Sequence, residues 1–177
     1  MTLIVNFFGP PSTGKSTMAA GIFNMLKTAD RNVEYIQEFA KSLTWEKNYG
    51  ALSNQFYVSG VQNYTQNMLI GQVEAVITDS PTLLGLLYYK EKNVKICKSF
   101  TNFITRTFKA QNNINFFIIR KKKYNPIGRN QTEKQSDEIG HKMRKLMDDC
   151  GVEYTIVDGN DDGKAEAYKH IIKALEK

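Results

Sequence analysis

The 177-residue sequence has little of what usually marks a metal-bound, cross-linked or membrane-spanning protein. Its two cysteines, Cys97 and Cys150, stand alone without C-x-x-C spacing, and His141 and His170 have no partner at metal-ligand spacing. These patterns argue against a structural zinc site and predict free, reduced thiols. No stretch approaches the roughly 18 consecutive apolar residues that a membrane span requires. We therefore expect a cytoplasmic protein with no membrane partner.

What the sequence does contain is an alternation of short apolar runs and helical patterns. Strands are predicted at residues 3–8, 32–36, 73–77, 115–120 and 154–157. The helical spacing of apolar residues predicts helices over residues 17–28, 39–47, 51–70, 83–90, 96–108 and 132–149, and in the C-terminal segment after Gly159. Several strands are almost wholly apolar, which is typical of a parallel sheet covered on both faces. With no repeat or linker, residues 1–177 are predicted to form a single α/β domain.

The most informative stretch reads G-x-x-x-x-G-K-S, the phosphate-binding P-loop, and lies between the first predicted strand and helix. Its glycines allow backbone N–H groups to turn around phosphate oxygens, and the helix N-terminus adds partial positive charge. Lys15 is expected to reach the β- and γ-phosphates of a nucleoside triphosphate, and Ser16 to ligate Mg²⁺. The predicted nucleotide-binding residues are Gly9, Pro10, Pro11, Ser12, Thr13, Gly14, Lys15, Ser16 and Thr17.

The residues that end the other predicted strands carry further chemistry, because ligands of open parallel sheets bind at the carboxyl ends of the strands. Glu38 ends the second strand, Asp79 the third and Arg120 the fourth, and the fifth is followed by Asp158 and Gly159. Asp79 is predicted to hold the Mg²⁺ shell or to accept a proton, and the alternative is a structural turn. Glu38 is predicted to bind and deprotonate an acceptor hydroxyl, and the alternative is a cap on the following helix.

The net charge of +6 is concentrated in one part of the sequence. Residues 120–145 contain nine Lys and Arg against three acids, and the rest of the chain carries fifteen charges of each sign. Such a cluster predicts a polyanionic partner, either nucleotide phosphates or nucleic acid, and the alternative is a solvated surface. We expect a basic lid at about residues 120–132, in which Arg120 and Arg129 contact the transferring phosphoryl group.

Aromatic and amide side chains are mixed between residues 45 and 64. Aromatic faces can stack on a base, and amides can hydrogen-bond to its edge. The apolar positions of the predicted helix 51–70 fit one buried face, whereas Trp45 and Tyr49 lie off that face. We therefore predict that Trp45 and Tyr49, together with Glu38, bind the acceptor.

Three segments, 8–17, 38–41 and 78–81, resemble the small P-loop kinases grouped with the ribosylnicotinamide kinase domain of the bacterial NAD regulator. Segments 124–133 and 157–159 are similar to phage-encoded members of that group, including 5-hydroxymethyluracil DNA kinases. The resemblance spans most of the chain and implies a five-stranded parallel sheet in the order 2-3-1-4-5, with ATP and Mg²⁺ as cosubstrates. It also implies an acceptor between Glu38 and Asp79, and an adenine near the turn after Val157.

These observations together predict an ATP-dependent kinase that transfers the γ-phosphoryl group to a hydroxyl of a nucleoside, a nucleotide or a hydroxymethylated base in DNA. Ser80, Pro81 and an apolar helix stand where ribosylnicotinamide kinases carry further acids, which argues against nicotinamide riboside as the acceptor. Two other classes stay open: a regulatory ATPase or nucleotide switch, and a nucleic-acid-binding protein with a vestigial site. The sequence has no N-K-x-D motif and no D-x-x-G after the third strand, which argues against a switch.

Overall fold

The computed structural model describes residues 1–90, 92–126 and 131–176, in which strands and helices alternate. The strands are β1 (Leu3–Phe8), β2 (Val33–Ile36), β3 (Ala75–Thr78), β4 (Asn112–Ile119) and β5 (Thr155–Asp158). The helices are α1 (Lys15–Thr28), α2 (Phe39–Trp45), α3 (Tyr49–Ser53), α4 (Gln55–Asn67), the 3₁₀ helix η1 (Thr82–Leu84), α5 (Gly85–Tyr88), α6 (Val94–Lys109), α7 (Glu133–Asp149) and α8 (Asp161–Leu175). Within these described ranges, no helix combines the length and the apolarity that crossing a membrane demands.

The strands form one five-stranded parallel sheet in the order β2-β3-β1-β4-β5. The predicted α/β class and the strand order 2-3-1-4-5 are therefore confirmed. Every residue of the central strand β1 is buried, because helices cover both faces of the sheet. The register aligns Asn6 of β1 with Thr78 of β3, and Phe8 with Phe117 of β4. The P-loop and Asp79 consequently leave the sheet at the same edge.

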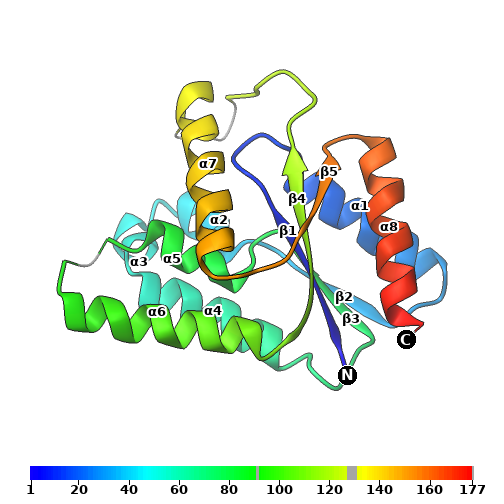
Figure 1. The fold of residues 1–177 in the computed structure, drawn as a ribbon, viewed down its shortest axis with the longest axis horizontal. Coiled ribbons are helices and arrows are strands. Elements are labelled where there is room, and N and C mark those ends of the chain that lie inside the picture. The colour runs from blue at the N-terminus through cyan, green and yellow to red at the C-terminus, as the bar shows by residue number, and fades with distance from the viewer. Residues whose placement is uncertain (91, 127–130, 177) are drawn as a thin grey trace.

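Helices lie on both sides of the sheet, with α1 and α8 on one side and α4, α5, α6 and α7 on the other (Figure 1). Alternate residues of β1 point to opposite faces. Val5 and Phe7 pack in the cluster that includes residues of α1 and α8, and Phe8 packs in the cluster that includes residues of α6 and α7. Strand β4 likewise contributes Phe116 to the first cluster and Phe117 to the second, so the two central strands β1 and β4 are buried from both faces.

The prediction of one helix over residues 51–70 is wrong in its extent and in its buried face. Asn54 separates α3 from α4, and its side chain accepts a hydrogen bond from the Tyr57 N–H. The buried residues of α4 are Gln55, Ser59, Gln62 and Gln66, whereas the exposed ones include Phe56, Tyr57 and Tyr64. The prediction assumed that apolar residues face inward, but α4 turns polar residues inward, and one of them, Gln62, lines a cavity beside β2.

Candidate functional site

The backbone of the P-loop depends on its two glycines. Gly14 adopts the left-handed conformation, with φ of 93°, and caps α1, which begins at Lys15. Gly9 has a φ of 152°, and a Cβ atom there would lie only 2.8 Å from Thr13 Oγ1. Side chains at either position are therefore strongly disfavoured. Lys15 Nζ lies 3.3 Å from the Pro10 carbonyl oxygen, so its ammonium group folds back over the loop.

Helix α7 braces the P-loop from one side. The Ser136 hydroxyl is buried and donates a hydrogen bond to the Pro11 carbonyl at 2.7 Å. Gly140 lies against Pro10, where a Cβ atom would come within 3.0 Å of the proline ring. Small residues on this face of α7 let helix and loop meet closely. These contacts pre-organise the loop.

The turn after β5 adjoins the same loop. The Gly159 N–H donates to the Ile119 carbonyl at 2.8 Å. A Cβ atom at Gly159 would lie 2.9 Å from that oxygen and nearer still to the Thr13 carbonyl, so only glycine fits. Asp158 forms an ion pair with Lys121 at 3.1 Å. Asp158 and Gly159 were the nucleotide-binding residues predicted outside the P-loop, and Gly159 lies directly beside that loop.

Asp79 follows β3 and is only 3% exposed. Within the described residues its Oδ1 atom has no hydrogen-bond partner, which is costly for a buried carboxylate and suits a site that receives a ligand or cation. The turn after β3 is held by Thr78, whose Oγ1 accepts from the Ser80 N–H at 3.1 Å. Burial and, to a smaller extent, the charge of Asp79 raise the pKa of Tyr35 in β2 above its ordinary value.

Glu38 is half-buried at the end of β2, and burial is the main cause that raises its pKa above the ordinary value. Lys15 opposes this pKa shift and Asp79 adds to it, so the three side chains interact electrostatically. Burial, with a smaller effect of Glu38, raises the pKa of Tyr88 in α5 to about 12. Glu38 stands at the N-cap position of α2, but its side chain makes no capping hydrogen bond. The helix-cap interpretation of Glu38 therefore has no support in the structure.

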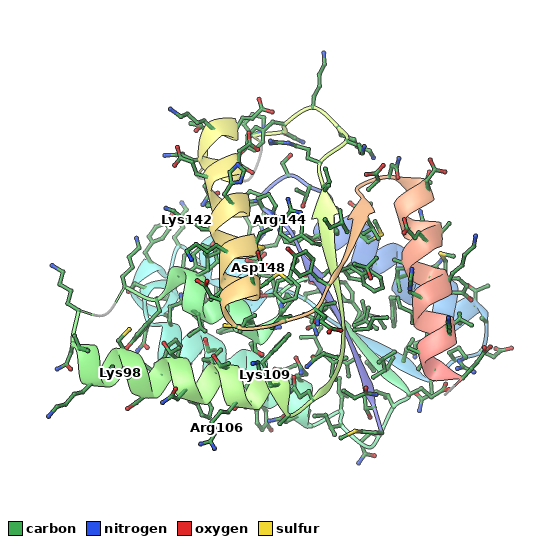
Figure 2. The ribbon with its side chains drawn as sticks, viewed as in Figure 1. Lys98, Arg106, Lys109, Lys142, Arg144 and Asp148 are labelled. Atoms are coloured by element: carbon green, nitrogen blue, oxygen red, sulfur yellow. The ribbon has the colours of Figure 1, made fainter. Side chains whose placement is uncertain are left out.

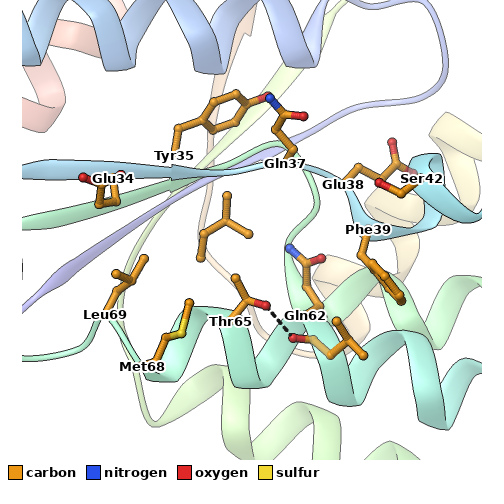
Figure 3. A pocket seen from close by; sticks show the side chains of 12 residues that line it. Glu34, Tyr35, Gln37, Glu38, Phe39, Ser42, Gln62, Thr65, Met68 and Leu69 are labelled. Carbon is orange, nitrogen blue, oxygen red and sulfur yellow. Dashed lines mark hydrogen bonds between the residues drawn. The ribbon is translucent and has the colours of Figure 1, made fainter.

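A cavity of about 390 Å³ opens beside Glu38, between the edge strand β2 and helix α4 (Figure 3). Small-molecule sites in proteins usually occupy roughly 300–1,000 Å³. Tyr35, Phe39 and Gln62 contribute to its walls. Gln62 also donates from Nε2 to Thr78 Oγ1 at 3.4 Å, which ties α4 to the end of β3. The inward polar face of α4 therefore supplies hydrogen-bonding groups to the cavity.

The predicted acceptor residues and the observed cavity agree only in part. Glu38 lines the cavity, but Trp45 and Tyr49 are not among its lining residues and are 73% and 60% exposed. Tyr35 was not predicted to belong to the site, and Gln62 was one of the amides between residues 45 and 64 but was not chosen as an acceptor residue. A signal for Gln62 is present in the sequence, because the polar residues 55, 59, 62 and 66 recur with helical spacing, just as the apolar residues beside them do.

Arg120 lies at the N-terminal end of α7. Its guanidinium forms ion pairs with Asp137 and, at 3.5 Å, with Glu133. Lys121 is also paired, with Asp158, so the cations that directly follow β4 are partly neutralised. Arg129, predicted to contact the transferring phosphoryl group, lies outside the described residues.

Comparisons with known proteins agree with this fold. The family described as "AAA domain" matches residues 4–163. A solved structure of deoxyadenosine kinase from M. mycoides, with products dCMP and a flexible dCDP bound, is similar with a TM-score of 0.62 over 98% of each chain. The identity between the two sequences is 16%, so the likeness shows a shared fold. The search among curated proteins found no match.

Proposed function

The chain belongs to the AAA-domain family, and on this premise we propose that it is an ATP- and Mg²⁺-dependent kinase. Its acceptor is a hydroxyl group of a nucleoside, a nucleotide or a hydroxymethylated base in DNA. The observation that carries the proposal is that Lys15, Glu38 and Asp79 follow the carboxyl ends of three adjacent parallel strands, at one edge of the sheet, where Glu38 lines a cavity of about 390 Å³. This arrangement combines a phosphate-binding loop with two carboxylates, as phosphoryl transfer to a hydroxyl requires.

In the donor half of the site, the loop N–H groups and Lys15 bind the β- and γ-phosphates of ATP. Ser16, in the first turn of α1, and Asp79 hold Mg²⁺, either directly or through water. The buried Asp79 oxygen, which lacks a partner within the described residues, fits this role. When bound, Mg²⁺ neutralises charge on the phosphates. Asp158 and Gly159 lie beside the adenine in this proposal.

In the acceptor half, Glu38 orients the acceptor hydroxyl and takes its proton. The hydroxyl oxygen bonds to the γ-phosphorus as the bond from that phosphorus to the bridging oxygen of ADP breaks. The raised pKa of Glu38 makes its ionised form a stronger base than an exposed glutamate. Asp79 is the alternative base. Glu38 is preferred because it lines the acceptor cavity.

Arg120 and Arg129 are proposed to stabilise the phosphoryl group in transfer, as the basic lid closes over ATP. Arg120 must first release Asp137 to do so. The Arg120 side chain is only 15% exposed, but the phosphate oxygens of a bound triphosphate accept charge-assisted hydrogen bonds from arginine as a carboxylate does, so they can take the place of Asp137. Trp45 and Tyr49 stay proposed acceptor contacts, which suits an acceptor that extends beyond the cavity, such as a nucleotide within a DNA strand.

The experiment that tests this function is an acceptor screen with γ-labelled ATP. Nucleosides, nucleotides, nicotinamide riboside and hydroxymethylated DNA are each incubated with the protein and Mg²⁺, with the Lys15→Ala variant as control. We expect label in one of the first, second or fourth classes and none with Lys15→Ala. ATP hydrolysis without transfer to any acceptor would establish a regulatory ATPase instead.

A further inference from the structure

Helix α6 carries four cations and no acid. The four residues, all exposed, are Lys95, Lys98, Arg106 and Lys109, and we refer to them as the α6 basic row. At 3.6 residues per turn they fall within an arc of about 80°, centred on Asn102. The buried stripe of Phe100, Ile104 and Phe108 occupies the opposite side of the helix. Figure 2 labels Lys98, Arg106 and Lys109 along α6.

Within the described residues the α6 basic row has no ion-pair partner, and its composition differs from that of helices α7 and α8. Across residues 1–90, 92–126 and 131–176, no member of the row forms an ion pair. Helix α7 has five acids and four Lys or Arg, and α8 has three of each. Like charges three residues apart on a helix repel each other. An unpaired row of one sign is therefore more stable when a polyanion neutralises it.

One end of the row lies on the acceptor side of the molecule. Tyr88, which precedes α6 in the chain, interacts electrostatically with Glu38. Tyr89 packs on Phe100 of α6, with 4.2 Å between the ring centroids. From there α6 runs to the start of β4, at the opposite edge of the sheet from the P-loop. The row therefore leads away from the acceptor side along one straight helix.

We propose that the α6 basic row binds the sugar-phosphate backbone of DNA, and that DNA rather than a free nucleoside is the acceptor. The binding stands by itself, whereas the role of DNA as acceptor rests on the proposed kinase function. From Lys95 to Lys109 the row extends about 21 Å at 1.5 Å per residue. This length corresponds to about six base-pair steps of duplex DNA. Asn102, at the centre of the row, adds an amide donor for phosphate oxygens.

A basic helix can also bind an anionic membrane, but the apolar surface of α6 favours nucleic acid. Helices that lie on membranes insert an apolar face among the lipids. The apolar stripe of α6 is instead buried in the core of the protein. The exposed apolar residues of α6 are Val94, Phe103 and Ile96, at 66%, 52% and 42%, and three residues form a smaller apolar surface than the continuous face that a membrane-bound helix inserts. An exposed phenylalanine beside cations is, however, able to stack on a base.

The test measures binding of a fluorescent, unmodified DNA duplex to the full chain without ATP, between about 50 and 200 mM salt. The variant combines Lys98→Gln, Arg106→Gln and Lys109→Gln, because glutamine preserves helix propensity. Loss of three phosphate contacts lowers the slope of log K against log salt by about 2.7. At physiological salt the affinity falls on the order of 100-fold.

The matched control removes three charges elsewhere, with Lys27→Gln, Lys169→Gln and Lys173→Gln on α1 and α8. All three lysines are exposed. We expect the control to change the slope by less than about one, the value of a single contact. An equal loss in both variants would mean that net charge alone binds DNA, and would overturn the proposal. Absence of DNA binding by the unmodified protein, or binding only to phosphatidylserine vesicles, would also overturn it.

Two further measurements keep the test decisive. Far-UV circular dichroism verifies that the triple variant is folded. If it is not folded, the single variant Lys98→Gln takes its place, and its expected change in the salt slope is about 0.9. DNA binding through α6 without phosphorylation of any acceptor would support the row and reject the kinase proposal. Phosphorylation of free nucleosides without DNA binding would reject the row and support the kinase.

Discussion

Two regions of the molecule are rich in lysine and arginine, and they differ in what surrounds the charges. In the basic segment, residues 120–132, Arg120 is paired with Asp137 and Lys121 with Asp158. In the α6 basic row, the described part of the chain offers no acidic partner to any cation. The first region uses its charge to attach a segment to α7 and to the turn after β5. The second presents its charge to solvent or to a partner.

A count of charges along the sequence does not distinguish binding of nucleotide phosphates from binding of nucleic acid, whereas the difference in pairing does. The basic segment lies next to the P-loop, since the Asn125 N–H donates to Ser12 Oγ at 2.9 Å. The exposed pair of Lys121 with Asp158 can exchange for nucleotide phosphates at little cost, because exposed pairs contribute only about 0–1 kcal/mol. Arg120, whose side chain is only 15% exposed, can exchange Asp137 for phosphate oxygens, which also accept charge-assisted hydrogen bonds. The α6 basic row needs no such exchange. We therefore assign nucleotide phosphates to the first region and nucleic acid to the second, and the predictions below test this assignment.

The largest expected effect separates the P-loop from the α6 basic row. Lys15→Ala removes the cation that binds the β- and γ-phosphates, so phosphoryl transfer should fall on the order of 10³-fold or more. DNA affinity should stay within about twofold, because charges beyond a Debye length are screened. Transfer of label from ATP and fluorescence anisotropy of DNA measure the two effects. A parallel loss of both would mean that the P-loop itself binds DNA.

The next effect concerns Glu38 and has two parts. Glu38→Gln should lower transfer about 10²- to 10⁴-fold, the usual contribution of a general base, while ATP affinity is kept. Burial raises the pKa of Glu38 in the folded state, so the folded protein favours the protonated carboxyl. The resulting gain in the free energy of unfolding is full below the ordinary pKa of 4.5 and is lost as the pH rises through the raised pKa. Glu38→Gln should therefore raise Tm at neutral pH, and this gain should vanish in acid.

Thermal unfolding at several pH values checks the stability part. Glu46→Gln, which changes an exposed glutamate just after α2, is the matched control and should leave phosphoryl transfer unchanged.

Asp79→Asn should abolish phosphoryl transfer as well, because Asp79 is assigned to the Mg²⁺ shell. Full turnover in Glu38→Gln would remove Glu38 from the mechanism and make Asp79 the base. A lower Tm of Glu38→Gln at neutral pH would contradict the inference that the buried, ionised Glu38 destabilises the folded protein.

The sequence was sufficient to predict the architecture, because several independent signals agreed. The glycine positions of the P-loop and the almost wholly apolar β1, every residue of which is buried, allow few other folds. The resemblance to P-loop kinases supplied the strand order. The ends of the strands also gave Glu38, Asp79 and Gly159, because parallel strands direct their carboxyl ends to one edge.

What the sequence did not predict has physical reasons. In α4, polar and apolar residues both recur with helical spacing, and only the neighbouring cavity determines that Gln62 faces inward. Trp45 was chosen because it lies off the apolar stripe, but that position is equally typical of an exposed residue. A charge count also gives no information on pairing. Arg120 is paired only because the fold brings the end of β4 next to Asp137, a residue of α7 that is 17 positions further along the chain.

A single acid placed within the α6 basic row should have an intermediate effect. Asn102→Glu puts a carboxylate four residues from both Lys98 and Arg106, where it pairs with them and repels phosphate. Loss of about one phosphate contact lowers DNA affinity about fivefold at physiological salt. Ala165→Glu, at an exposed position of α8, is the control for added negative charge and should have no effect. Equal losses in both variants would mean that DNA senses only the net charge.

The smallest expected effect tests the other side of the comparison. Asp137→Asn removes the main partner of Arg120 and leaves Glu133 at 3.5 Å, so the basic segment gains a free cation. If DNA binds along α6, its affinity should change by less than about twofold, because an exposed charge outside the interface is screened. Asp149→Asn is the matched control, since it frees Lys145 on the same helix. A gain of about 0.9 in the salt slope with Asp137→Asn, but not with Asp149→Asn, would place DNA on the basic segment and remove the distinction between the two regions.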